Sequence, residues 1–139
     1  MKQSPLFSKT YDFVAWVIPV TVKFPRYQRF VMAAALQHES LHFQELIIEA
    51  AHKPDPDERL TDADAELDKI RTHVRLCLEM DLLEPGQYQH AAGLLTEMGN
   101  LLGGWIKKSR SVLRKRQAWV RHLRRDRWIR ARRLVEQHS

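Results

Sequence analysis

The sequence lacks features on which several classes of protein depend. One cysteine, Cys77, stands among 139 residues, so an internal disulfide is excluded, and its apolar helical surroundings predict a core residue. The longest apolar run, at 13–22, is far shorter than a membrane span, and no convincing cleavage site follows it. We therefore expect a cytoplasmic protein that has no membrane partner.

Strand signals are also absent. No segment alternates convincingly between apolar and polar residues, and no Asn-Gly hairpin turn occurs. Apolar residues instead recur every three to four positions along almost the whole chain. This pattern predicts an all-α fold, with an antiparallel up-down four-helix bundle at residues 1–110 and a basic helical extension at residues 111–139.

Turn and cap residues indicate where the first three helices begin and end. The first helix is expected at Ser8–Lys23, with a kink at Pro19. The second is expected at Pro25–His52, because proline favours the first helical turn. The segment KPDPDE (53–58) predicts a loop, and Thr61 is the expected N-cap of the third helix.

The fourth helix, which follows the turn EPG at 84–86, carries the clearest apolar stripe. The stripe comprises Tyr88, Ala91, Leu95, Met98, Leu102 and Trp105. Each glycine inside a helix costs about 1 kcal/mol relative to alanine, so a packing reason is expected for it. We expect Gly99 and Gly103 to allow a neighbouring backbone to approach closely, and a bend at Gly103–Gly104 is the alternative.

The second helix carries two apolar lines. One line comprises Phe30, Ala34, Leu41 and Ile48, and the other comprises Met32, Leu36, Phe43, Ile47 and Ala50. A helix that is apolar over so much of its circumference is usually buried on two sides. Because the bundle is small, we expect one of those sides to contact another subunit.

The motif HESLH at 38–42 fits the H-E-x-x-H pattern of zinc hydrolases. The extended pattern would need a glycine and a histidine where Glu45 and Ile48 stand, and no strand is expected to hold a substrate. Glu58 or Glu66 could be a third ligand, but nothing in the sequence supports either. The carboxylate–histidine spacing of di-iron bundles also occurs here, without the second pair that such a site needs. We interpret the motif as a polar helix face and expect no metal, cofactor or catalytic residue.

Acidic residues are scarce at the C-terminal end. Residues 107–139 contain 13 Lys/Arg and 2 Asp/Glu, a net charge of +11, whereas the other 106 residues carry a net charge of −5. Trp119 and Trp128 are interleaved with the basic residues. Basic side chains neutralise phosphates and tryptophan stacks on unpaired bases, so nucleic acid is the expected partner. A solvated helix and a helix on an anionic membrane are the alternatives.

Three segments resemble a known family. YDFVAWVIPVTVKFPRYQRF (11–30), ELIIEAA (45–51) and LLTEMGNLLGGWIKKSR (94–110) are similar to the accessory variability determinant (Avd) proteins of diversity-generating retroelements. They are also similar to the related four-helix-bundle proteins encoded in ribosomal-RNA intervening sequences. The likeness covers roughly residues 8–110, and its motifs are moderately specific.

The resemblance implies a non-enzymatic accessory subunit. Such proteins are four-helix bundles that form a basic homopentamer and bind a reverse transcriptase and its template RNA during mutagenic copying. A stand-alone nucleic-acid-binding bundle of the intervening-sequence type is the alternative, and a zinc hydrolase is a remote one. The packing residues that match the family's segments are Gly99, Gly103 and Trp105.

The candidate nucleic-acid-binding residues fall into two groups. The resemblance implies a role for the basic residues in matching segments, which are Arg26, Arg29, Lys107, Lys108 and Arg110. The extension departs from the family, so its residues are predicted to contact RNA or polymerase on charge alone. These residues are Arg114, Lys115, Arg116, Arg121, Arg124 and Arg125.

Overall fold

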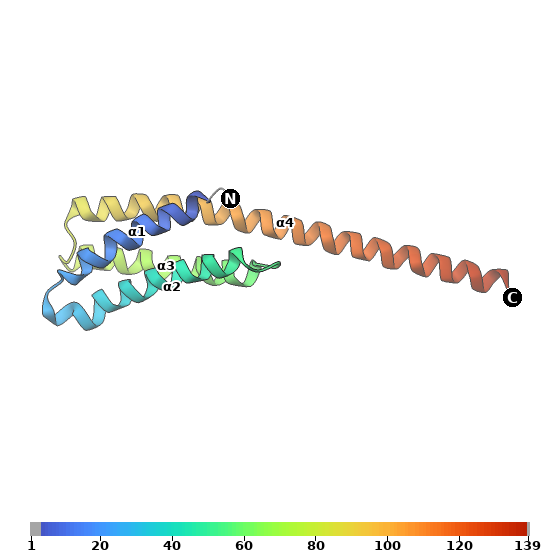
Figure 1. Cartoon of the computed structure of the whole chain (residues 1–139), viewed down its shortest axis with the longest axis horizontal. Coiled ribbons are helices and arrows are strands. Elements are labelled where there is room, and N and C mark those ends of the chain that lie inside the picture. Colours follow the sequence, from blue (N-terminus) through green and yellow to red (C-terminus); the bar gives the residue numbers. More distant parts are fainter. Residues whose placement is uncertain (1–3, 139) are drawn as a thin grey trace. The chain divides into compact units, whose positions relative to one another are not determined.

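The computed structural model describes residues 4–138, and this part of the chain contains helices and no strand. The elements are α1 (Pro5–Val22), the 3-10 helix η1 (Arg26–Gln28), the π-helix η2 (Arg29–Ala33), α2 (Ala34–Ala51), α3 (Asp57–Glu79) and α4 (Pro85–Gln137) (Figure 1). The predicted all-α fold is therefore confirmed. None of these helices combines the length and the apolar character that a membrane crossing needs.

The chain divides into two compact units between Ile106 and Lys107. We call the first unit, described from Ser4 onward, the body, and we call residues 107–138 the C-terminal unit. Helix α4 contributes its first part to the body and forms the whole C-terminal unit. The sequence placed the boundary a few residues later, after residue 110.

In the body, neighbouring helices run in opposite directions. Lys9 on α1 forms an ion pair with Glu97 on α4 at 2.9 Å. Further along α1, the Trp16 ring lies 5.1 Å from the ring of His90, which is an earlier residue of α4. Because residue numbers rise on α1 while they fall on α4, the two helices are antiparallel. The ribbon shows the same alternation through α2 and α3, as the sequence predicted (Figure 1).

The core of the body is built from one apolar stripe on each helix. Its largest fully buried side chains include Phe13 on α1, Phe43 on α2, Ile70 on α3 and Met98 on α4. Cys77 on α3 is also fully buried, as predicted for a core residue. On α4 the predicted stripe faces this core, with its two aromatic ends partly buried.

The two apolar lines predicted on the second helix have different surroundings. The line Met32, Leu36, Phe43, Ile47 and Ala50 is buried. In the other line, Phe30 is 89% exposed, and Leu41 and Ile48 are 42% and 45% exposed. One side of the helix is thus covered within the chain, and the partner predicted for the other side stays a prediction.

Helix α1 begins earlier than the sequence suggested. Ser4 is its N-cap, and the Ser4 hydroxyl accepts a hydrogen bond from the backbone N–H of Leu6 at 3.4 Å. Pro5 takes the first helical position, where its missing N–H is of no consequence. The Ser8 hydroxyl donates to the Pro5 carbonyl inside the first turns, so the prediction of a start at Ser8 was wrong.

The start of the second helix also differs from the prediction. Pro25 precedes the 3-10 turn η1, and the chain then passes through the π-helical segment η2 before α2 begins at Ala34. The segment is helical from Arg26, but its first eight residues are not α-helical. Within the π-helix, the side chain of Phe30 is exposed, whereas those of Met32 and Ala33 are buried.

Helix α3 begins before the predicted cap. Asp57 and Glu58, which were assigned to a loop, form its acidic first turn, where carboxylates favour the positive end of the helix dipole. Thr61 lies inside the helix, and its hydroxyl donates to the Asp57 carbonyl at 2.9 Å. The prediction of Thr61 as an N-cap was therefore wrong.

Candidate nucleic-acid interface

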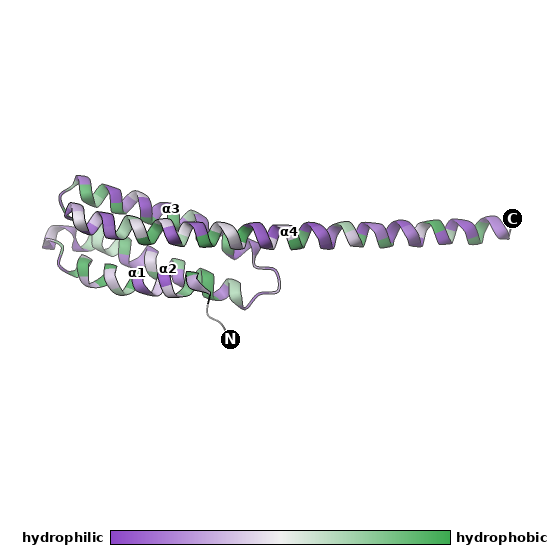
Figure 2. Ribbon diagram, turned by 90° about the horizontal axis from the view of Figure 1, so that it is seen from above, coloured by the Kyte–Doolittle hydropathy of each residue, from purple (hydrophilic) through white to green (hydrophobic). Residues whose placement is uncertain are grey.

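The basic side chains of the C-terminal unit are all exposed. They include nine residues predicted to bind nucleic acid, which are Lys107, Lys108, Arg110, Arg114, Lys115, Arg116, Arg121, Arg124 and Arg125. Four further arginines, at 127, 130, 132 and 133, are exposed in the same unit. Hydrophilic residues dominate this part of α4, with apolar residues between them (Figure 2).

Helical geometry sorts these charges into faces. Six residues follow one another at steps of three, four or seven, and therefore lie on one side of α4. We call them the basic stripe, which consists of Lys107, Arg110, Arg114, Arg121, Arg125 and Arg132. At 1.5 Å per residue the stripe is about 37 Å long. Three other arginines, at 116, 127 and 130, lie on the opposite side of the helix.

Acidic side chains neutralise little of this charge. The unit contains two carboxylates, Asp126 and Glu136. Asp126 lies 3.4 Å from His122, and Glu136 lies 3.3 Å from Arg132, each one helical turn away. Exposed pairs of this kind contribute little free energy, so they leave the unit strongly basic.

Two exposed tryptophans lie among the basic residues. Trp119 and Trp128 are each 62% exposed, and the guanidinium carbon of Arg132 lies 5.4 Å from the centre of the Trp128 ring. Nine residues separate the two rings, so they face opposite sides of the helix. Trp128 lies between Arg125 and Arg132 on the side of the basic stripe, whereas Trp119 lies on the opposite side, near Arg116. An exposed ring beside basic side chains is suited to stacking on an unpaired base.

Arg26 and Arg29, the remaining predicted nucleic-acid contacts, belong to the body. They lie in η1 and η2 and are exposed. Their neighbours in the chain are the aromatic residues Tyr27 and Phe30, which are 74% and 89% exposed. These two arginines are thus flanked by exposed aromatic side chains.

The HESLH motif joins α2 to α3. Glu39 is buried, and its carboxylate accepts a hydrogen bond from Nδ1 of His73. Nδ1 of His42 lies 3.2 Å from the buried carboxylate of Glu66 on α3. His38 is exposed, and its ring stacks on that of His42 with 6.0 Å between their centres. Residues 4–138 contain no group of three metal-binding side chains that could hold a metal ion.

The interpretation of the motif as a polar helix face was therefore only partly correct. On the polar face of α2, His38, Glu45, Glu49 and His52 are exposed, and His42 is partly exposed. Glu39 points to the other side of α2 and is only 8% exposed. Sequence spacing alone could have placed Glu39 among the buried residues, because it lies three and four residues from Leu36 and Phe43.

The glycines of α4 differ in their surroundings. A Cβ atom added at Gly99 would collide with the guanidinium group of Arg71 on α3, so a side chain, rather than the predicted backbone, occupies that space. A Cβ atom at Gly103 would meet nothing within 4 Å, so packing inside the described chain gives no reason for this glycine. Trp105 packs on α1, with its ring 6.1 Å from that of Phe7.

Comparisons with known proteins point to one family and one fold. The family model described as bAvd-like matches residues 6–109. A solved structure from Bacteroides thetaiotaomicron, a protein of unknown function from the S23 ribosomal protein family, superposes with a TM-score of 0.68 at 21% sequence identity. That match covers 73% of this chain and 95% of the other. No curated protein matches the sequence.

Proposed function

This chain belongs to the bAvd-like family, and on that premise we propose that it is a non-catalytic accessory subunit of a diversity-generating retroelement. In this function it binds template RNA and the reverse transcriptase and supports mutagenic cDNA synthesis. The reverse transcriptase supplies the chemistry, and the accessory subunit holds RNA close to it. The exposed charge of the C-terminal unit is the single observation that carries the RNA-binding part of the proposal.

The basic stripe is the proposed RNA-binding surface. Each phosphate that it neutralises releases counterions, and this release favours binding at low salt. The other basic residues of the unit, Lys108, Lys115, Arg116 and Arg124 among them, add to the long-range attraction. The family model ends at residue 109, so most of this surface lies outside the part of the chain that defines the family.

Self-association is the second part of the proposal. The resemblance implies a homopentamer, and the exposed apolar line of α2 supports contact between copies of the chain. Several copies in one assembly would bring several basic stripes to the same RNA. Such multivalency raises affinity without any new kind of contact.

A test of RNA binding compares the full chain with a chain that lacks residues 111–139. The probe is a synthetic single-stranded RNA, and the dissociation constant is measured over a range of salt concentrations. We expect the deletion to weaken binding and to flatten the slope of log K against log salt. An unchanged slope would contradict the role of the C-terminal unit.

The polymerase partnership needs a separate test. A reverse transcriptase encoded beside this gene should co-purify with the full chain, and cDNA synthesis should depend on the chain being present. If no such enzyme binds while RNA does, the chain is a stand-alone nucleic-acid-binding bundle of the intervening-sequence type. The fold shared with the S23-family structure is compatible with this second candidate.

A zinc hydrolase is the weakest candidate. The general base of such an enzyme would be Glu39, but this carboxylate is bonded to His73 and buried between two helices. A hydrolase would bind one zinc ion per chain and lose activity on Glu39→Gln. Elemental analysis of the purified protein tests this directly.

A further inference from the structure

Two aromatic side chains and a valine are exposed at the turn between α1 and α2. Tyr27, Phe30 and Val31 are 74%, 89% and 60% exposed, and we call them the aromatic knob. Phe30 and Val31 belong to the π-helical segment η2. Because π-helical turns are rare and frequently mark functional sites, this local geometry suggests a surface that binds something. The bundle core does not use the knob.

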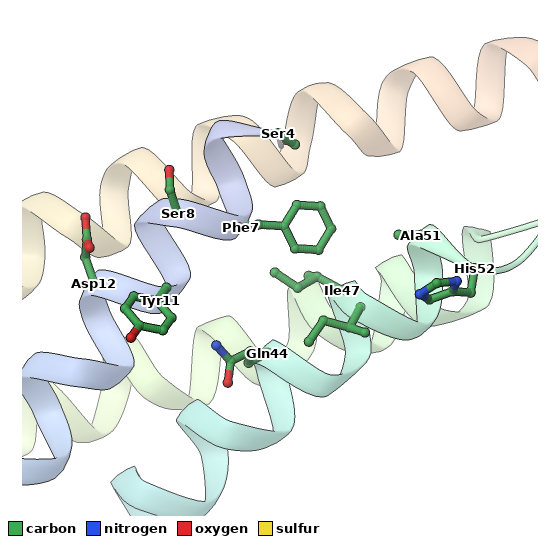
Figure 3. A pocket seen from close by; sticks show the side chains of 10 residues that line it. Ser4, Phe7, Ser8, Tyr11, Asp12, Gln44, Ile47, Ala51 and His52 are labelled. Carbon is green, nitrogen blue, oxygen red and sulfur yellow. The ribbon is translucent and has the colours of Figure 1, made fainter. Parts of the chain in front are cut away.

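An apolar groove lies at the other end of the same helix pair. It has a volume of about 820 Å³ and is open to solvent between α1 and α2. Phe7 of α1 and Ile47 of α2 point toward one another across it, and Tyr11 and Ala51 lie along its sides (Figure 3). Ile48, which is 45% exposed, also lines the groove and belongs to the exposed apolar line of α2.

The knob cannot fill the groove of its own chain. Phe30 and Ile48 are 18 residues apart along η2 and α2, which corresponds to a distance of about 27 Å. Both features are apolar and open to solvent. An aromatic side chain seated in an apolar, desolvated pocket is the usual centre of a protein interface.

Charge supports the same pairing. The knob is flanked by the exposed Arg26 and Arg29, whereas Asp12 lines the groove and the exposed Glu45 stands three residues from Ile48. A second copy that brings its knob to this groove would place arginines beside carboxylates. The same carboxylates repel phosphate, so the groove does not suit nucleic acid.

We propose that the aromatic knob of one copy inserts into the α1/α2 groove of a second copy, with Arg26 and Arg29 facing Asp12 and Glu45. This inference deepens the self-association proposed above and rests on it. The contact is head-to-tail, since two different surfaces meet, and repetition of such a contact closes a ring when the rotation allows it. It also gives Arg26 and Arg29 a role at the subunit contact.

The first test uses substitutions on the surface of the full chain. Phe30→Asp removes the knob, Ile48→Asp blocks the groove, and Leu76→Asp is the control, because Leu76 is an exposed leucine on α3. Native mass spectrometry should show an oligomer for the wild type and the control. Each of the other two variants should associate at least about tenfold more weakly, with unchanged helicity.

Mixing the two variants is the decisive step. The Phe30→Asp chain keeps an intact groove and the Ile48→Asp chain keeps an intact knob, so an equimolar mixture should form a 1:1 heterodimer through one intact contact. A mixture that stays monomeric overturns the proposal, because it shows that knob and groove do not meet. A monomeric wild type, or variants that keep the wild-type mass, also overturns it.

Charge reversal gives an independent test of the same contact. Arg26→Glu with Arg29→Glu makes one variant, and Asp12→Lys with Glu45→Lys makes the other. Each variant alone brings like charges together at every contact and should dissociate, whereas their mixture pairs opposite charges and should assemble again. Failure of the mixture to assemble contradicts the proposed facing of the charges.

RNA binding separates this inference from the function on which it rests. The Phe30→Asp chain keeps the whole C-terminal unit, so it should still bind a synthetic single-stranded RNA with the salt slope expected for a single chain. If the Phe30→Asp chain binds RNA and is still an oligomer, the proposed knob–groove contact is wrong and the proposed function stands. If the wild type assembles through this contact but does not bind RNA, the proposed function is wrong and the contact stands.

Discussion

Nδ1 of His73 on α3 lies 2.6 Å from Oε1 and 2.9 Å from Oε2 of Glu39 on α2. The carboxylate is almost wholly buried, whereas the histidine side chain is 31% exposed. A buried carboxylate without a hydrogen-bond donor would strongly destabilise the fold, so the pair fixes how α2 and α3 face each other. The glutamate of HESLH therefore has a structural role in this molecule.

We predict that Glu39→Ala destabilises the body more than Glu39→Gln does. Alanine leaves the histidine without its acceptor and creates a small cavity, which should lower the free energy of unfolding by about 1–3 kcal/mol. Glutamine keeps the shape and one acceptor oxygen, so its effect should be smaller. Urea unfolding followed by circular dichroism measures both values. Equal losses for the two variants would mean that the charge, rather than the hydrogen bond, matters.

Most of the helical fold followed from the sequence because apolar spacing is a direct record of burial. The stripe on α4 and the buried line on α2 were both readable in this way. Helix starts were less readable, since Ser4 and Ser8 are both residue types suited to cap the first helix. The structure shows that the Ser4–Pro5 pair decides the first start, and that the acids at 57 and 58 decide the third.

The site was only partly predictable. Charge alone identified the C-terminal unit, but the aromatic knob depends on a π-helical turn at 29–33 that no simple spacing rule indicates. The groove is lined by residues of both α1 and α2, such as Phe7 and Ala51, so it depends on tertiary packing. The partner of Glu39, likewise, is 34 residues away in the chain.

The thiol of Cys77 predicts how stability changes at alkaline pH. Burial, with a smaller contribution from the Glu39 carboxylate, raises the pKa of the Cys77 thiol from 9.0 to about 11. Below pH 9 the thiol is protonated in both folded and unfolded chains. Between pH 9 and pH 11 the unfolded chain loses this proton while the folded chain keeps it, so the free energy of unfolding falls as the pH rises.

The measurement compares the wild type with Cys77→Ala in urea at several pH values. The difference in unfolding free energy between the two proteins should be constant up to pH 9. Above that pH it should shrink by at most about 1.4 kcal/mol per pH unit, because one proton is involved. A difference that stays constant up to pH 11 would contradict the burial of the thiol.

We predict that RNA binding depends on which face of the C-terminal unit is neutralised. Changing Arg114, Arg121 and Arg125 to glutamine removes three charges from the basic stripe. For single-stranded RNA this change should lower the salt slope by about 2 and weaken binding. The matched control changes the three arginines on the opposite side, at 116, 127 and 130, to glutamine.

The control removes the same net charge, so it isolates the effect of position. It should weaken binding because the long-range attraction for RNA is reduced, but it should leave most of the salt slope in place. Fluorescence anisotropy of a labelled RNA measures both the affinity and the slope. Equal slopes for the two triple variants would show that the unit acts as a diffuse charge and has no preferred face.

Trp128 distinguishes unpaired from paired RNA, because it lies three residues after Arg125 and four before Arg132, on the side of α4 that carries the basic stripe. Stacking on one base contributes about 1–3 kcal/mol, so Trp128→Ala should weaken binding to a single-stranded RNA by about tenfold. Bases in a duplex are already stacked, and affinity for a duplex of the same length should therefore change little. Trp119→Ala is the comparison, because Trp119 lies three residues after Arg116, on the opposite side of the helix. The same loss on both RNAs would indicate a packing role for Trp128.

Gly99 and Gly103 of α4 have different surroundings, so we predict that substitution by alanine affects stability differently at the two positions. Gly103 has open space beside it, so Gly103→Ala should raise the free energy of unfolding by about 0.5–1 kcal/mol through helix propensity alone. Gly99→Ala should gain less, because the new methyl group must displace the Arg71 guanidinium, which lies 3.0 Å from Asp68.

Thermal unfolding, together with native mass spectrometry, measures both effects. If Gly103→Ala stabilises the chain and leaves its oligomeric mass unchanged, the glycine has no packing role in the assembly. If the mass falls, another copy must approach the α4 backbone at Gly103. The close approach predicted from the sequence would then exist between subunits, where a single chain cannot display it.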